Sequence, residues 1–392
     1  MNNKLLILCP GYPSFQNPTN GIFTHRSVQS LMKLYDVEVV HFSAFTFSRL
    51  KKNTHAYEGV TVHRVPILQL PNFNNSFLIF LNSYLLSFFL PIIFSKKWLN
   101  SFDYFHSTML FPISFGVSKL LSKLGKTHIA QGIGNDVNSV FVKLSSLNCV
   151  SKRFKLIDYF QFNSKALELL FIYNAQFKTN TFVLYRGVDL DLFYCKEFDD
   201  VKNESIKFLF LGGLQLSSNI YSTKNFKGIH VVLKSWSKLD LQNLNVDLIL
   251  GGPGLNQVFF SKWLKTLKYP GKVTFVSTVN PLYLSALLRK VDVVLIPSLS
   301  EGLPNLANES QASGTLVIAS NVGGIPESVI DGYSGFLNEA GDIDGFVNAM
   351  KKVIDNPEIL KEYGENGSKY IKDSFTWENY NNKLAEKFTK LK

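Results

Sequence analysis

The sequence contains little cysteine. Cys9, Cys149 and Cys195 are the only cysteines among 392 residues, and no two of them form a CxxC pair. This spacing argues against a disulfide scaffold or a zinc site, and it is typical of a protein of the reducing cytoplasm. The N-terminal apolar run "LLILCP" is too short for the hydrophobic region of a signal peptide. We therefore expect this run to form a first buried strand.

The chain also has no low-complexity tract and no internal repeat. Hydrophobic residues make up 46% of it and charged residues only 18%, which excludes a disordered protein and predicts an ample core. A chain of 392 residues is too long for one ordinary core. We therefore expect two domains, each of roughly 150–200 residues.

Acidic residues are scarce in the first half. Residues 1–188 contain 19 Lys and Arg against 7 Asp and Glu, whereas residues 189–392 contain 22 against 23. This asymmetry predicts an anionic partner for the first half, such as an acidic substrate or a membrane surface. Neither zinc-finger spacing nor an RNP-like aromatic motif occurs, so we expect no nucleic acid among the partners.

Short apolar runs alternate with longer helical patterns along the whole chain, and this alternation predicts parallel βαβ units. We expect an α/β fold with two tandem Rossmann-like, doubly wound parallel-sheet domains, at 1–188 and 189–372, followed by a closing helix at 373–392. The expected strands are Leu5–Cys9, Val37–Phe42, Val60–Val65, Tyr104–His106, His128–Gln131 and Phe182–Tyr185 in the first domain, and Ile206–Leu211, Val246–Leu250, Val273–Val276, Val291–Pro297, Leu316–Ala319 and Phe336–Leu337 in the second.

One segment departs from this alternation. Residues 76–94, "SFLIFLNSYLLSFFLPIIF", are almost entirely apolar and precede Lys96, Lys97 and Trp98. Polar residues dilute the run and Pro91 interrupts its end, so a transmembrane helix is disfavoured. Two interpretations remain open: a buried crossover helix, or a helix that contacts a bilayer surface with the lysines and Trp98 at the headgroups. The positive surplus of this half favours the membrane-contacting interpretation of 76–98.

Two glutamates flank a predicted helix start after the apolar strand at 291–297. Glu301 lies in the loop, Pro304 suits the first helical position, and Glu309 follows in the helix. Ligands of open α/β sheets bind at the carboxyl ends of strands, and a helix N-terminus there attracts anions. Glu309 would lie about 7–8 Å along the helix at 1.5 Å per residue. This spacing suits a ribose held by Glu309 and a sugar held by Glu301.

Glycines follow three further strands of the second domain. They are Gly212 and Gly213, then Gly251, Gly252 and Gly254, then Gly323 and Gly324, and Lys227 precedes another glycine at a helix start. Glycine lets the backbone approach a ligand closely, and lysine provides a point charge for phosphate. The second domain is therefore the expected nucleotide site.

Taken together, these motifs resemble those of the retaining glycosyltransferases of family 4, which have the GT-B architecture. The resemblance rests on E-x7-E (301–309), GGxPE (323–327) and Lys-Gly (227–228), together with "RGVDLDLF" at the hinge, "SFTWENY" in the closing helix and the N-terminal "PGYPSFQNPTNGIF". It covers residues 4–390 and is more specific in the second half.

The resemblance implies that the second domain binds a UDP- or GDP-sugar and the first an acceptor, with hexosyl transfer in the cleft between them, retention of configuration and no metal. It implies a catalytic role for Glu301, with His106 as the remaining histidine candidate. The implied donor-binding residues are Gly212, Gly213, Lys227, Gly252, Gly302, Leu303, Asn305, Glu309, Gly323 and Gly324, and those of the acceptor side are Gly11, Gly21 and Asp136. We expect a cytoplasmic enzyme, peripheral on the inner face of the membrane, that builds a surface polysaccharide, lipopolysaccharide or glycolipid.

Three positions depart from the family pattern. Gly213 stands where an arginine usually meets the diphosphate, with Lys224 as a possible substitute; the turn at 133–136 lacks the usual catalytic histidine; and Arg186 replaces an asparagine. Two alternatives therefore stay open, a nucleotide-sugar 2-epimerase and a non-catalytic partner of another transferase. We interpret Asp189-x-Asp191 as hinge and Asp342-x-Asp344 as a solvated turn, so neither predicts a metal site.

Overall fold

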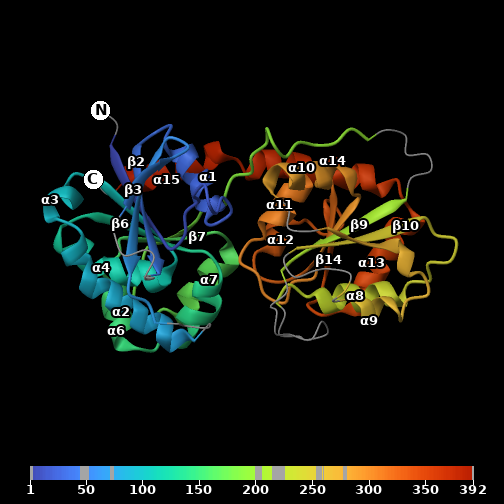
Figure 1. Ribbon diagram of the computed structural model, residues 1–392, viewed down its shortest axis with the longest axis horizontal. Helices are drawn as coiled ribbons and strands as arrows, with labels where there is room; N and C mark the ends of the chain where they lie inside the picture. Colours follow the sequence, from blue (N-terminus) through green and yellow to red (C-terminus); the bar gives the residue numbers. More distant parts are fainter. Residues whose placement is uncertain are drawn as a thin grey trace. The chain divides into compact units, whose positions relative to one another are not determined.

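The computed structural model of the protein describes residues 3–44, 53–70, 75–198, 205–213, 226–252, 258, 260–276 and 280–390. The chain forms two compact units, one made of Met1–Gly187 and Trp377–Lys392, the other of Val188–Thr376. Each unit is built on a largely parallel β-sheet (Figure 1). The expected α/β fold with two Rossmann-like units is confirmed.

The first unit contains an eight-stranded sheet of order β3-β4-β2-β1-β5-β6-β7-β8, in which only β3 runs antiparallel to its neighbour. Its strands are β1 (Lys4–Cys9), β2 (Asp36–Ala44), β3 (Asn53–Tyr57), β4 (Val60–Ile67), β5 (Tyr104–Thr108), β6 (Thr127–Gly132), β7 (Tyr159–Phe162) and β8 (Thr181–Val183). Its helical segments are α1 (Ile22–Leu31), α2 (Ser76–Ile93), α3 (Lys96–Asn100), η1 (Leu110–Ser114), α4 (Phe115–Lys123), η2 (Asp136–Phe141), α5 (Val142–Leu144), α6 (Asn148–Phe154), α7 (Lys165–Asn174) and α15 (Trp377–Thr389).

Strand β1 shows how the sequence produces a sheet with two covered faces. Successive side chains of a strand point to opposite faces. Leu5 and Ile7 pack with α1 and α15, whereas Leu6 and Leu8 pack in a separate core with α2 and α4. A strand covered on both sides needs an uninterrupted apolar run, which is why "LLILC" does not alternate with polar residues.

The second unit contains a six-stranded, wholly parallel sheet of order β11-β10-β9-β12-β13-β14. Its strands are β9 (Ile206–Leu211), β10 (Val246–Gly251), β11 (Val273–Val276), β12 (Val293–Ile296), β13 (Leu316–Ser320) and β14 (Gly335–Asn338). Its helical segments are α8 (Ile229–Lys238), α9 (Ser261–Leu264), η3 (Pro270–Lys272), α10 (Pro281–Lys290), α11 (Asn305–Ala312), α12 (Ile325–Ser328), α13 (Ile343–Asp355) and α14 (Ile359–Ser374).

The last helix, α15, belongs to the first unit although it is far from it in sequence. Tyr380, Leu384 and Phe388 lie in the same core as β1 and α1. The side-chain amide of Asn381 donates to the carbonyl and hydroxyl oxygens of Ser30, at 3.1 and 2.7 Å. The C-terminal segment is therefore an integral part of the first unit.

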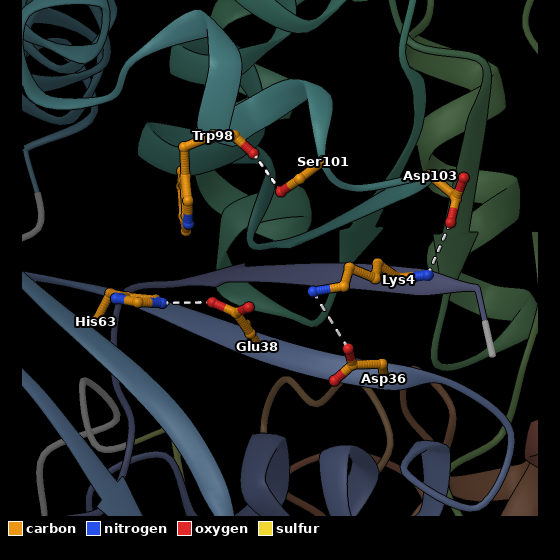
Figure 2. A network of polar contacts seen from close by, with 7 residues as sticks. All are labelled: Lys4, Asp36, Glu38, His63, Trp98, Ser101 and Asp103. Atoms are coloured by element: carbon orange, nitrogen blue, oxygen red, sulfur yellow. Dashed lines mark hydrogen bonds and ion pairs between the residues drawn. The ribbon is translucent and has the colours of Figure 1, made fainter. Parts of the chain in front are cut away.

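Polar contacts connect strands near the amino end of the first sheet (Figure 2). The backbone N–H of Lys4 donates to the Asp103 carboxylate at 2.8 Å, and the Lys4 ammonium lies 3.4 Å from Asp36. On the neighbouring strands β2 and β4, His63 Nε2 lies 2.6 Å from Glu38 Oε2. These charged groups have partners within the unit, so we interpret them as structural.

Candidate functional site

The second sheet has a topological switch point between β9 and β12. The chain builds outward from β9 through β10 to β11, and then returns to β12 on the other side of β9. Ligands of such sheets bind outside the carboxyl ends of the strands at this point, where the flanking loops diverge. The loops after β9 and β12 are therefore the first place to search for a site.

Two charged side chains meet there. Lys227 precedes α8, Glu301 follows β12, and the Lys227 Nζ lies 2.8 Å from the Glu301 Oε2. The Ser298 hydroxyl donates to the same oxygen at 3.2 Å. The lysine side chain is 48% exposed and the glutamate 16% exposed. The structure thus brings together two of the predicted site residues, and it adds Ser298, which lies three residues before Glu301 in "SLSE" and which the sequence analysis did not select.

Backbone contacts hold these two loops together. A Cβ atom at Gly228 would lie 1.8 Å from the Pro297 carbonyl oxygen, and this glycine has a φ of +71°. The backbone N–H of Leu299 donates to the Phe226 carbonyl at 2.8 Å. Only glycine fits a left-handed position with a carbonyl so close. This explains why a glycine must follow Lys227.

The GGxPE loop after β13 packs on the Glu301 loop in the same way. A Cβ at Gly323 would lie 1.9 Å from the Glu301 carbonyl oxygen. The Gly324 N–H donates to the Gly302 carbonyl at 2.8 Å. The two sequence motifs of the second unit are therefore parts of one rigid backbone arrangement.

Helix α11 begins one residue later than the sequence predicts. Pro304 is not the first helical residue but the capping residue, in an extended conformation, and Asn305 begins the helix. An extended residue before the helix is compatible with the fixed φ of proline. Gly302, Leu303 and Asn305 thus lie around the N-terminus of α11, where free backbone N–H groups can bind an anion.

Glu309 lies within α11 and is only 6% exposed. The helix around it is anchored to α12. The Gln311 side chain donates to the Ser328 carbonyl at 2.8 Å, and the Ser328 hydroxyl donates to Asn308. A ligand that contacts Glu309 would therefore reach a carboxylate held in a fixed position.

The glycines after β9 and β10 also lie side by side. The Gly212 N–H donates to the Gly251 carbonyl at 2.9 Å, and a Cβ at Gly252 would lie 2.4 Å from the Gly212 carbonyl oxygen. Gly213 is the last described residue of this strand end. Lys224 and Gly254 lie outside the described residues.

Gly11 and Gly21 bring two loops of the first unit into contact at the carboxyl end of β1. A Cβ at Gly21, which has a φ of +70°, would lie 2.3 Å from the Gly11 carbonyl oxygen. The polar residues beside them carry no motif that the sequence alone would reveal. The Tyr12 hydroxyl lies 2.7 Å from His25 Nδ1, and His25 Nε2 lies 2.9 Å from Glu58 Oε2. Tyr12 and His25 are both buried, so this chain of contacts holds α1 against the β3–β4 turn.

Asp136 and His106 occupy buried positions in the first unit. The Asp136 carboxylate accepts backbone N–H groups of Leu110, Ile133 and Gly134, at 2.8, 3.1 and 2.9 Å, and burial raises the pKa of this carboxyl above its ordinary value. His106 is 2% exposed, with its Nε2 2.9 Å from the Gln161 oxygen. Burial lowers the pKa of His106 to about 4. These surroundings favour structural roles for both side chains.

The two Asp-x-Asp sequences have local contacts. The Asp189 carboxylate accepts the Leu192 N–H at 3.3 Å. Asp342 caps α13 by accepting the Gly345 N–H at 2.9 Å, and Asp344 pairs with Lys238. Within the described part of the chain, no group of three or more His, Cys, Asp or Glu side chains is arranged to hold a metal ion.

Known glycosyltransferases have sequences similar to that of this chain. Residues 217–370 match the sequence model of the family described as glycosyl transferases group 1. The matched region lies within the second unit. An uncharacterized glycosyltransferase of Methanocaldococcus jannaschii is 28% identical over 391 residues, which cover 93% of each chain. The capsular polysaccharide biosynthesis glycosyltransferase CapM of Staphylococcus aureus is 28% identical over 170 residues, which cover 41% of this chain and 44% of CapM.

Solved structures share the fold of the whole chain. Sucrose-phosphate synthase of Thermosynechococcus elongatus is similar with a TM-score of 0.74 and 18% identity, over 100% of this chain and 99% of its own. HepE of Anabaena, solved in complex with UDP-glucose, is similar with a TM-score of 0.68 and 17% identity, over 99% of each chain. The chain therefore has a GT-B fold, and the sequence comparisons support glycosyltransferase activity.

Proposed function

We propose that this protein transfers a hexose from a nucleoside diphosphate sugar, such as a UDP- or GDP-sugar, to a saccharide or lipid-linked saccharide acceptor. The transfer retains the anomeric configuration and needs no metal, and the product contributes to a surface polysaccharide or glycolipid. The observation that carries this proposal is the Lys227–Glu301 pair at the switch point of the second sheet.

The pair suits a donor whose diphosphate leaves with negative charge. Lys227 is half-exposed, so a phosphate can replace Glu301 as the partner of its positive charge. The N–H groups at the start of α11 add further positive potential in a rigid position. Preorganised donors of this kind stabilise charge that develops in the transition state. Lys227 and α11 therefore perform the role that a metal ion has in other transferases.

Once Lys227 contacts phosphate, the Glu301 carboxylate is free to bind the sugar. A carboxylate there would accept hydrogen bonds from sugar hydroxyls and would stabilise positive charge on the sugar ring. Glu309, deeper in α11, would accept hydrogen bonds from the ribose. The acceptor binds to the first unit in this proposal, on the cytoplasmic side of the membrane.

The proposal is supported by the family match over 217–370 and by the UDP-glucose complex of HepE. The CapM relative supports a role in polysaccharide synthesis. The position of Gly213, where the resembled family has arginine, keeps a non-catalytic partner as the second candidate. Such a partner would bind the donor without transferring its sugar.

A ligand screen tests donor binding. Thermal unfolding is measured with a panel of UDP-, GDP- and ADP-sugars, because a ligand present at 100 times its Kd adds about 2.7 kcal/mol to the stability. We expect one donor class to raise the melting temperature of wild type but not of Lys227→Ala. Lys238→Ala is the matched control, since Lys238 is a half-exposed lysine paired to Asp344 in the same unit. No stabilisation by any nucleotide sugar would contradict the proposal.

Product analysis separates the remaining alternatives. Sugar transfer that depends on an added saccharide, with the anomeric configuration retained by NMR, supports the transferase. Release of free nucleotide with an isomerised sugar and no acceptor would indicate the epimerase. Binding without turnover on any acceptor of the panel would indicate the non-catalytic partner.

A further inference from the structure

Helix α2 of the first unit is long and contains no charged residue. It begins after Asn75, whose side chain accepts the N–H groups of Phe77 and Leu78 at 2.9 and 3.3 Å, and it ends at Ile93. Among the described residues it is the one helix with the length and composition to cross a membrane. Its contacts with the rest of the unit show how it is used instead.

One side of α2 is bound into the fold. The Asn82 side chain accepts the Leu70 N–H at 2.7 Å and donates to the Leu70 carbonyl at 3.0 Å. Leu86 and Leu90 lie in the core with β1 and β2, and Leu86 packs closely on Gly116 of α4. A helix that left the unit to span a bilayer would lose these contacts. We therefore expect α2 to stay on the unit.

The other side of α2 is apolar and exposed. Phe77, Leu81, Phe88 and Ile92 are 64, 37, 69 and 73% exposed, and Tyr84 lies in the same series. Spacings of three and four residues place these side chains in one stripe along the helix. Its buried residues are Asn82, Ser83, Leu86 and Leu90. A helix face in contact with water usually carries polar residues, so this apolar stripe indicates a surface that is covered in the working protein.

Basic residues lie near the apolar stripe at two places. Lys96 and Lys97 follow the C-terminal end of α2 and are exposed. Arg153 of α6 donates to the Ser87 hydroxyl at 3.1 Å, and the exposed Lys152 precedes it in α6. Figure 1 shows α2 and α6 at the same end of the first unit.

The balance of charge in this region is strongly positive. Residues 75–157 contain nine Lys and Arg but only two acidic residues, Asp103 and Asp136, and Asp136 is buried. A second copy docked through the same face would bring like charges together, because a two-fold interface pairs identical patches. A neutral apolar partner would leave the lysines without a function. An anionic surface with an apolar interior matches both features.

We propose that the exposed face of α2 docks on an anionic phospholipid bilayer, with the helix lying along the surface. The apolar stripe enters the boundary between headgroups and acyl chains, and Lys96, Lys97 and Lys152 contact lipid phosphates. Trp98, which the sequence analysis places at the headgroups, also has contacts within the unit. It stacks on Phe94 and contacts His63 within the unit, so it supports the helix end from inside.

Vesicle flotation tests this proposal with the full chain and without substrate, so its outcome is independent of the proposed catalytic function. We expect wild type to float with phosphatidylcholine vesicles that contain phosphatidylglycerol, and at least tenfold less with pure phosphatidylcholine. Salt at 0.5 M reduces the Debye length to roughly 4–5 Å and weakens the lysine contacts, but a fraction held by the apolar stripe remains. A protein that stays unbound at low salt, or that floats equally with neutral vesicles, overturns the proposal.

Two variants separate the apolar and the charged contributions. Phe88→Asp with Ile92→Asp removes the two most exposed side chains of the stripe and should lower binding at least tenfold. Phe89 is a poorer choice because it is half-buried. Lys96→Glu with Lys97→Glu should remove most of the salt-sensitive part. Val258→Asp with Leu282→Asp, which changes two exposed apolar residues of the second unit, is the matched control and should bind as wild type does.

A folding check and an oligomer measurement complete the test. Circular dichroism establishes that each variant is folded, and Phe88→Ser with Ile92→Ser replaces the aspartates if they unfold the protein. Sedimentation velocity of wild type should show a monomer that the α2 variant does not change. An oligomer of wild type that the α2 variant dissociates would assign the stripe to a second copy. Unchanged flotation of the α2 variant would also overturn the proposal.

Discussion

The carboxyl ends of the two sheets differ in what they expose. In the second unit, Glu301 and Lys227 meet at the switch point and remain accessible, and glycines allow three loops to touch through their backbones. In the first unit, Asp136 follows the end of β6 and His106 lies in the middle of β5; both are buried, and each already has hydrogen-bond partners. The same architecture thus leaves polar residues accessible at the edge of one sheet and buries them as part of the fold in the other.

The difference teaches how far a motif indicates function. A polar residue at a strand end becomes a candidate for chemistry only if the local backbone leaves it accessible. The glycines of the second unit create that access because they let neighbouring loops pack without side chains. Asp136 instead occupies the place where such loops need a shared acceptor for three N–H groups.

The largest expected effect comes from Glu301→Gln, which keeps the shape of the side chain but removes its charge. We expect kcat to fall about 10²–10³-fold, as is found when one preorganised transition-state contact is lost. The melting temperature should change little. Glu309→Gln should mainly raise KM for the donor. Glu365→Gln, at an exposed position of α14, is the control, and equal kinetics of the Glu301 variant and this control would remove Glu301 from the site.

The next effect concerns the other edge. Asp136→Ala leaves three backbone N–H groups without their acceptor, one buried and two partly buried, so we expect a loss of about 3 kcal/mol in the free energy of unfolding. Donor binding should persist at temperatures where the variant is folded. Urea denaturation gives the stability and calorimetry the affinity. A stable variant with impaired transfer would instead place Asp136 in the reaction.

Acid sensitivity should also arise from the first unit. Burial lowers the pKa of His106 to about 4 and that of His128 to about 3, both below the ordinary 6.5. Below pH 6.5 the unfolded chain therefore binds more protons than the folded one. The free energy of unfolding consequently decreases as the pH is lowered from 6.5. One such histidine costs on the order of 2 kcal/mol at pH 5. His106→Asn should flatten the pH dependence of the unfolding midpoint between pH 6.5 and 5, whereas an identical slope would refute this origin.

The smallest expected effect is that of metal removal. Lys227 and the N–H groups of α11 supply the positive potential that a diphosphate needs, so EDTA should change turnover less than about twofold. The measurement compares initial rates after EDTA treatment with rates after added Mg²⁺ or Mn²⁺. Loss of turnover with EDTA and its return with Mn²⁺ would show that Lys227 and α11 do not suffice and that a metal ion is essential.

Much of the fold could be predicted because buried parallel strands are continuous apolar runs. Two strands were missed for physical reasons. β3 is "NTHAY", a largely exposed edge strand whose only clear signal is the tight turn at Glu58 and Gly59, both with positive φ. β7 is "YFQF". A run of only four residues is too short for its pattern to distinguish a strand from a buried helix segment.

The site was predictable to a different degree. Glu301 and Lys227 were selected from motif spacing together with the family resemblance, and the structure brings them into contact. The glycines are predictable because close backbone approach imposes glycine at fixed positions. The burial of His106 could not be predicted from the sequence, because a histidine in a strand can face either a ligand or the core. The partial exposure of α2 was equally undecidable, because a buried helix and a surface-docking helix share one composition.

The position of α15 affects how the protein is made. Because the first unit consists of Met1–Gly187 and Trp377–Lys392, the second unit is an insertion within it. Tyr380, Leu384 and Phe388 complete the core that β1 and α1 begin. A growing chain on the ribosome has therefore synthesised the entire second unit before the first can close. The face of β1 and α1 that packs on α15 therefore stays uncovered until Trp377–Thr389 has been synthesised.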